Sequence, residues 1–191
     1  MQILRCFSQG GSIGIQTYLD KTLHLNAYLA CAVGGIYDSC FCAIVDINNV
    51  NKIMNKTQSL PESFKLFCKL VPLMATRDIP GLVCGKIYGP AISSYFFDKP
   101  EDQLGMAEKM FGSFSMIALL QIYASPQTAV TTKIIQNNSL SAFQGFKIVL
   151  VTEANQLPQR IFSRMILAAG RNAIALAMAD ELLVRLKKKS F

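Results

Sequence analysis

The chain has little charge for its length, a single histidine and no tryptophan. Of its 191 residues, 16% are charged and 51% are hydrophobic. A chain of this composition has ample material for a core, and more apolar surface than a monomer of this size readily buries. The length is typical of one domain, so we expect residues 1–191 to form a single domain.

The scarcity of histidine and the spacing of the cysteines exclude the common zinc sites. His24 is the only histidine, so a site of two histidines and two cysteines cannot form. Cys40-Phe41-Cys42 lacks the two-residue spacer of a C-x-x-C pair. We therefore expect no metal and no cofactor, and we expect the cysteines to be free, buried thiols in a reducing compartment.

The sequence also lacks a recognisable catalytic constellation. Asp20 and His24 lie four residues apart and could meet on one face of a helix. A triad would still need a nucleophile, and none of Ser12, Ser94 and Cys84 lies in a motif such as G-x-S-x-G. No facing pair of carboxylates of the kind that a glycosidase or a two-metal enzyme needs is evident. The sequence therefore favours a protein that binds over an enzyme.

Two further absences predict a cytoplasmic location. The segment Met1–Phe7 is followed at once by Ser8, Gln9 and a pair of glycines, so it has no apolar stretch of signal-peptide length. The longest apolar run, Met110–Ala124, is interrupted by glycine, serine and glutamine, and is too short and too polar to span a bilayer. We expect no transmembrane segment.

What the chain does contain is a series of short apolar runs rich in β-favouring residues. They come in pairs separated by turn signals: Ala27–Gly34 with Cys40–Ile47, Leu82–Tyr88 with Ile92–Phe97, and Ala129–Gln136 with Phe146–Thr152. Local hairpins predict an antiparallel sheet, and the helical patterns after each pair predict helices packed on it. The expected fold class is α+β in the order ββα-ββα-ββα, after a first helix near Gln16–Leu25.

Helix signals are strongest at three places. Ser59-Leu60-Pro61-Glu62 has the spacing of a capping box and predicts a helix towards Leu70. A second helix is expected from Asp98–Glu101 to about Tyr123, and its Gly105 and Gly112 share one face, which would permit close packing. The third is a long helix over Pro158–Phe191.

The long C-terminal helix carries its basic residues on one stripe, which is apolar in the middle. At 100° per residue one face collects Arg160, Arg164, Leu167, Arg171, Met178, Leu182, Arg185 and Lys189. Such a surface matches an acidic, amphipathic segment of a protein partner by helix-in-groove recognition. A break at Gly170 would separate the first two arginines from the rest.

These observations favour a non-catalytic adaptor, or a chaperone-like subunit of an intracellular multiprotein complex, that binds its partner through this stripe. Bacterial secretion adaptors share the profile by analogy only. Self-association into a homo-oligomer is another way to cover the apolar surface.

Two alternatives remain open. Gly10, Gly11, Ser12 and Gly14 follow a predicted strand over Gln2–Phe7, and a glycine loop before a helix can cradle phosphate. The loop lacks the lysine of a P-loop and the G-x-G-x-x-G spacing, yet it would suit a small-ligand or nucleotide-binding protein or enzyme. The other alternative is a weak nucleic-acid or anionic-membrane binder that uses Lys187–Lys189. Because the stripe contains no aromatic residue, nucleic acid is the less favoured of these two.

The excess of apolar residues generates a first prediction. The chain purified without whatever covers its apolar surface should self-associate, because low charge and high hydropathy leave that surface exposed to water. Size-exclusion chromatography with light scattering measures this. A monodisperse monomer at high concentration in plain buffer would contradict the prediction.

Overall fold

The computed structural model describes the backbone of residues 2–189 and the side chains of residues 8–179. Every element in this part of the chain is helical. The α-helices are α1 (Gln2–Lys21), α2 (Ala27–Ile53), α3 (Leu60–Val83), α4 (Gly89–Phe97), α5 (Met106–Gln136), α6 (Ala142–Thr152) and α7 (Leu157–Lys189). A π-helical turn, η1 (Cys84–Tyr88), joins α3 to α4, and a short 3₁₀ turn, η2 (Glu101–Gln103), precedes α5.

The predicted α+β fold is therefore wrong, since the described residues contain no strand. The first pair of predicted strands lies inside the single helix α2, and the other two pairs lie in η1 and α4 and in α5 and α6. Short apolar runs do not distinguish a strand from a buried helix, and packing overrides weak β propensity. The residues between the first two pairs of runs, Gly35–Ser39 and Gly89-Pro90, which the turn signals predicted to be turns, are helical too. Pro90 lies in the first turn of α4, where proline is tolerated.

Several local predictions are confirmed. The Ser59 capping box is present: the Glu62 carboxylate accepts a hydrogen bond from the Ser59 backbone N–H at 3.0 Å, and the Ser59 hydroxyl accepts one from the Glu62 N–H. The long C-terminal helix forms, and it continues through Gly170 without a break.

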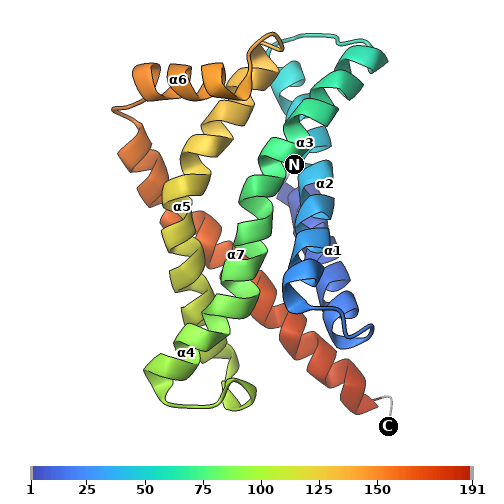
Figure 1. The fold of residues 1–191 in the computed structure, drawn as a ribbon, viewed down its shortest axis with the longest axis vertical. Helices are drawn as coiled ribbons and strands as arrows, with labels where there is room; N and C mark the ends of the chain where they lie inside the picture. Colours follow the sequence, from blue (N-terminus) through green and yellow to red (C-terminus); the bar gives the residue numbers. More distant parts are fainter. Residues whose placement is uncertain (1, 190–191) are drawn as a thin grey trace.

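Five long helices close into a ring. In contact order they are α1, α2, α3, α5 and α7, and α7 returns to contact α1. Figure 1 shows α6 lying across one end of this bundle, while α4 extends α3 at the opposite end. The ring places one face of each of the five helices towards a common interior.

Small residues allow the helices to approach closely. A Cβ atom added at Gly112 of α5 would lie 2.0 Å from the carbonyl oxygen of Gly89, and one at Gly35 of α2 would lie 2.7 Å from Ile79 of α3. Beside the first contact, the Ser113 hydroxyl donates a hydrogen bond to the Gly85 carbonyl at 2.8 Å. The close packing that the sequence predicted is therefore confirmed for Gly112, although its partner is a helix rather than a sheet. It is wrong for Gly105, which precedes α5 and has only the Glu108 carboxylate near its Cβ position.

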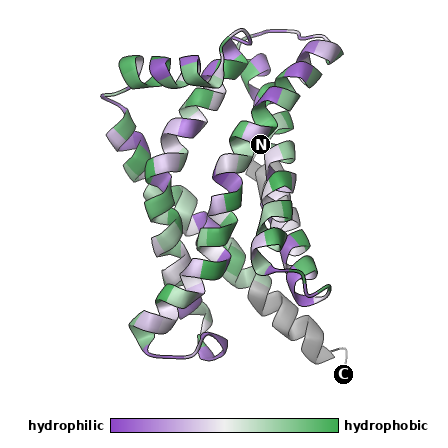
Figure 2. Ribbon diagram, viewed as in Figure 1, coloured by the Kyte–Doolittle hydropathy of each residue, from purple (hydrophilic) through white to green (hydrophobic). Residues whose placement is uncertain are grey.

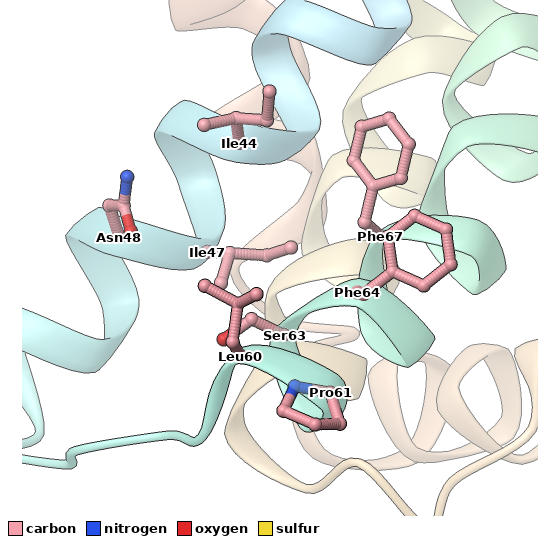
Figure 3. A pocket seen from close by; sticks show the side chains of 8 residues that line it. All are labelled: Ile44, Ile47, Asn48, Leu60, Pro61, Ser63, Phe64 and Phe67. Atoms are coloured by element: carbon pink, nitrogen blue, oxygen red, sulfur yellow. The ribbon is translucent and has the colours of Figure 1, made fainter.

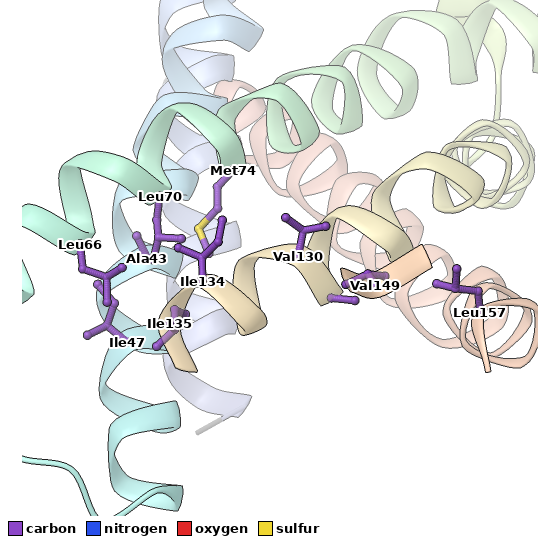
Figure 4. Packing of buried hydrophobic residues seen from close by; sticks show 11 residues of the cluster. Ala43, Ile47, Leu66, Leu70, Met74, Val130, Ile134, Ile135, Val149 and Leu157 are labelled. Carbon is purple, nitrogen blue, oxygen red and sulfur yellow. The ribbon is translucent and has the colours of Figure 1, made fainter. Parts of the chain in front are cut away.

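The apolar core is divided into two clusters. The larger joins α2, α3, α5, α6 and the start of α7 (Figure 4), and its buried members are Ala43, Ile47, Leu66, Leu70, Met74, Ala129, Val130, Ile134, Ile135, Val149 and Leu157. The smaller joins α1, α5 and α7 through Ile13, Ile117, Ala169 and Leu176. Both clusters are small for a chain of this hydropathy, because many apolar side chains lie outside them.

The glycine contact gives a second prediction. Gly112→Ala should lower the free energy of unfolding by about 2 kcal/mol, because its methyl group collides with rigid backbone. Gly10→Ala is the matched control: nothing lies within 4 Å of its Cβ position, so the substitution should be neutral or stabilise α1 by up to about 1 kcal/mol. Thermal unfolding followed by circular dichroism compares the two. Equal losses of stability would contradict the packing described here.

Candidate functional site

The interior of the ring contains a cavity of about 410 Å³ that all five helices line. Its wall holds six charged residues of both signs, namely Asp38, Asp46, Arg77, Asp78, Arg164 and Arg171. Uncharged polar side chains add to them, Gln9 and Ser12 from α1 among others. Apolar side chains, Ile13, Ile117 and Leu176 among them, line the rest of the cavity, so its wall is mixed.

Side-chain hydrogen bonds join each helix of the ring to the next. The Ser8 hydroxyl of α1 donates to the Asp38 carboxylate of α2, and Ser39 of α2 donates to Asp78 of α3 at 2.9 Å. On the other side of the ring, Gln9 of α1 donates to the side-chain oxygen of Asn172 in α7 at 2.8 Å.

The ring is completed through Thr128 of α5. Its hydroxyl oxygen accepts from Arg77 of α3 at 3.1 Å and from Arg164 of α7 at 2.7 Å. Arg77 also donates to its neighbour Asp78 at 2.6 Å. We call these contacts the polar circuit: Ser8–Asp38, Ser39–Asp78, Arg77–Thr128, Thr128–Arg164 and Asn172–Gln9.

Arg171 differs from the other two arginines of the cavity. It lies seven residues after Arg164 and therefore on the same face of α7, about 10 Å further along the helix. Among the residues that the structure describes, Arg171 makes no hydrogen bond or ion pair. A guanidinium group in such a cavity can bind a carboxylate or phosphate in bidentate geometry.

Many large apolar side chains lie on the outside of the ring. Large exposed side chains follow α2, with Leu29, Val33, Ile36 and Ile44 on its outer surface. In Figure 2 hydrophobic segments recur along α2 and α5, and the connections at both ends are hydrophilic.

By length and composition, two stretches of the described chain could cross a membrane, namely α2 and Leu157–Ala179 of α7. A core helix of a soluble protein passes the same test, but it is then mostly buried. Only 39% and 22% of the most apolar windows of these two stretches are buried.

Outside the cavity, charged side chains gather near the ends of the helices. The end that carries α6 has seven basic residues, Lys52, Lys56, Lys65, Lys69, Lys133, Lys147 and Arg160, against the acids Glu62 and Glu153. Among the residues whose side chains the structure describes, Lys86 of η1 is the one charged residue that lies neither at an end of the bundle nor in the cavity wall. The charges thus divide between the two ends of the bundle and its centre.

At the α6 end, Glu153 ties three helices together. Its carboxylate accepts a hydrogen bond from Lys133 of α5 at 2.9 Å and pairs with Arg160 of α7. Partial burial alone would raise the pKa of Glu153, but the hydrogen bond from Lys133 and the charge of Arg160 outweigh it, so the pKa lies below its ordinary value.

The basic stripe predicted on α7 is divided by the structure. Arg164, Leu167 and Arg171 line the cavity, Arg160 pairs with Glu153, and Met178 is exposed. The side chains of Leu182, Arg185 and Lys189 lie outside the described residues, as does the run Lys187–Lys189.

The glycine loop predicted at Gly10–Gly14 does not form, because this segment lies in the middle of α1. Ser12 lines the cavity, and its hydroxyl donates to the Gln9 carbonyl at 3.0 Å. Gly11 packs against the ring of Tyr37, while Gly10 and Gly14 have open space at their Cβ positions.

Sequence reasoning missed the cavity residues of α2 and α3. The sequence does contain signals that could have identified them. Asp38 and Asp46 are isolated acidic residues, eight positions apart, in an apolar stretch, and Arg77-Asp78 is a charged pair between Pro72 and Pro80. No cluster of metal-ligating side chains occurs in the part of the chain that the structure describes.

Comparison with known proteins found no matching family model and no significantly similar curated protein or solved structure.

The ion pairs of Glu153 predict a dependence of stability on pH. Folding lowers the pKa of the Glu153 carboxyl group. Glu153 therefore stabilises the protein at pH values above the pKa that this group has in the unfolded chain, and the contribution is lost as the pH falls through its pKa in the folded protein. Glu153→Gln should therefore cost about 1 kcal/mol at pH 7 and little at pH 3. Glu101→Gln makes the same change of charge at an exposed residue and is the control. Thermal melts at both pH values test this, and an equal cost at pH 3 would contradict it.

Proposed function

We propose that this protein is embedded in a membrane and binds a small polar solute that carries an anionic group in the cavity between its five helices. One observation carries the proposal: charged side chains converge on the interior while large apolar side chains cover the outside. In lipid, ionisable residues face the interior of a bundle or a water-filled cavity and commonly mark a solute pathway.

Helix dimensions support this proposal. At 1.5 Å per residue, the 27 residues of α2 and the 31 of α5 extend about 40 Å and 46 Å. Both exceed the roughly 30 Å hydrocarbon thickness of a bilayer. Prolines lie within α3 and α5, at Pro72, Pro80 and Pro126. Such prolines are costly in soluble helices but common in membrane helices, where neighbouring groups satisfy the freed carbonyls.

Recognition of the solute is assigned to Arg171. The guanidinium of Arg164 already donates to Thr128, whereas Arg171 has no described partner to give up. A cavity of about 410 Å³ lies within the range of small-molecule sites. Asp38 and Asp46 on the facing helix suit a solute that also carries hydrogen-bond donors.

The adaptor function and the cytoplasmic location remain predictions, and the present proposal differs from them in what covers the apolar surface. An adaptor would cover it with a protein partner, whereas a membrane protein covers it with lipid. The stripe residues Arg164, Leu167 and Arg171 line the cavity, which favours a small solute over a partner helix at that part of α7.

The test has two stages. After expression, the protein should remain in the membrane pellet through a carbonate wash and require detergent for extraction. Thermal unfolding of the detergent-purified protein is then measured with ATP, malate or arginine. At a hundredfold excess over its dissociation constant a bound solute adds about 2.7 kcal/mol of stability, so at least one of these should raise the melting temperature.

Arg171→Gln should weaken that solute's binding by tenfold or more, because it removes a charged hydrogen bond. Arg160→Gln removes an arginine outside the cavity and should leave the solute-induced shift intact. A protein that stays soluble and monodisperse without detergent would overturn the membrane proposal and support the adaptor function.

A further inference from the structure

A second hollow lies on the outside of the bundle, between the last turns of α2 and the first turns of α3. It has a volume of about 490 Å³ and almost wholly apolar walls. Figure 3 shows Ile44 and Ile47 on α2 on one side, with Phe64 and Phe67 on α3 on the other. We call this hollow the α2–α3 groove.

The walls of the groove are partly aromatic and open to the surroundings. The rings of Phe64 and Phe67 stack with centroids 6.3 Å apart and planes 20° from parallel. Leu60 is 87% exposed and Phe64 is 65% exposed, so the groove presents hydrocarbon rather than hiding it. An exposed apolar hollow of this kind fits a flexible hydrocarbon chain.

The mouth of the groove is basic. Lys52 lies one helical turn beyond the lining residue Asn48 on the same face of α2, and the exposed Lys65 follows Phe64 on α3. Glu62 is the one acid nearby, and its carboxylate accepts hydrogen bonds from the Ser59 backbone N–H and hydroxyl. The net charge at this mouth is therefore positive.

The position of the groove along α2 suggests its occupant. It lies where the apolar helix ends and the polar connection to Ser59 begins, which in a membrane protein is the boundary between hydrocarbon and head groups. Basic residues at this level attract anionic lipids.

We infer that the α2–α3 groove binds an acyl chain of a phospholipid whose anionic head group lies at Lys52 and Lys65. This inference rests on the proposed function, since it needs the bundle to lie in a bilayer. The bound lipid fills the space between the two helices where no side chain of the described residues does.

Because the chain contains no tryptophan, a single introduced tryptophan reports on the groove. Phe64→Trp places it inside the groove, and Leu60→Trp provides a second reporter at the rim should the first variant fold poorly. Phe162→Trp, at a residue 64% exposed on α7, is the control outside the groove. Each variant is reconstituted into phosphatidylcholine vesicles that contain a few per cent of phosphatidylglycerol with brominated acyl chains.

Bromine quenches tryptophan fluorescence on contact. We expect the groove reporters to be quenched at least threefold more than the Phe162→Trp control at the same bromolipid content. Adding Lys52→Glu and Lys65→Glu to the groove reporter should reduce its quenching to the control level.

The outcomes separate the two proposals. Equal quenching of the groove and control reporters would overturn the lipid site and leave membrane embedding supported. Absence of quenching in every variant would overturn membrane embedding itself. Quenching of the groove reporter could also be the same with brominated phosphatidylcholine as with brominated phosphatidylglycerol, and unchanged by Lys52→Glu and Lys65→Glu. That result would overturn the role of the anionic head group and with it the site as proposed.

Discussion

The polar circuit is the interaction on which the rest of the structure depends. Each of its five hydrogen bonds joins two neighbouring helices, and together they close the ring from α1 round to α7. In water such bonds contribute about 1 kcal/mol each, but a buried donor or acceptor left without its partner costs more. The circuit therefore selects one arrangement of the helices, since sliding any helix by a turn would strand a buried polar group. Thr128 is its most constrained member, because it serves two arginines from two helices.

Close backbone contact is the second condition for this ring. Gly112 lies against the backbone of Gly89, and Gly35 lies against the backbone and side chain of Ile79, so the helices approach closely at both places. Small residues at helix interfaces are also how membrane helices associate, because lipid provides no hydrophobic force to press them together. The bundle thus combines two apolar clusters with close packing contacts and interior hydrogen bonds, and many of its large apolar side chains lie on the outside. The same two features, hydrogen bonds across the interior and small residues at the helix contacts, accompany the central cavity.

Local signals in the sequence predicted more than global ones. The capping box at Ser59 and the long helix from Leu157 depend on neighbouring residues, and both were predicted correctly. The predicted strands were wrong because each was identified as a short run of apolar, β-favouring residues. An apolar helix contains such runs equally often. Ala27–Gly34 and Cys40–Ile47 are separated by Asp38 and Ser39, which resembled a turn. In the structure both residues lie inside α2 and form hydrogen bonds to neighbouring helices, Asp38 with Ser8 and Ser39 with Asp78. Convergence of Asp38, Asp78 and Thr128 from three helices leaves no spacing signal in one sequence.

The stripe on α7 shows the limit of periodicity most clearly. A 100° repeat identifies which residues share a face, but not whether that face points inward or outward. An outward basic stripe needs an apolar opposite face that is buried. On α7 the opposite face is buried at Ala169 and Ala173, whereas Phe162, Ile166 and Ile174 are exposed. The helix therefore has a buried apolar stretch opposite its arginines and further hydrocarbon that is exposed, while Arg164 and the exposed Arg171 line the cavity. Exposed hydrocarbon is favourable only where something apolar covers it, so it is Phe162, Ile166 and Ile174, rather than the orientation of the arginines, that bear on the environment of the protein.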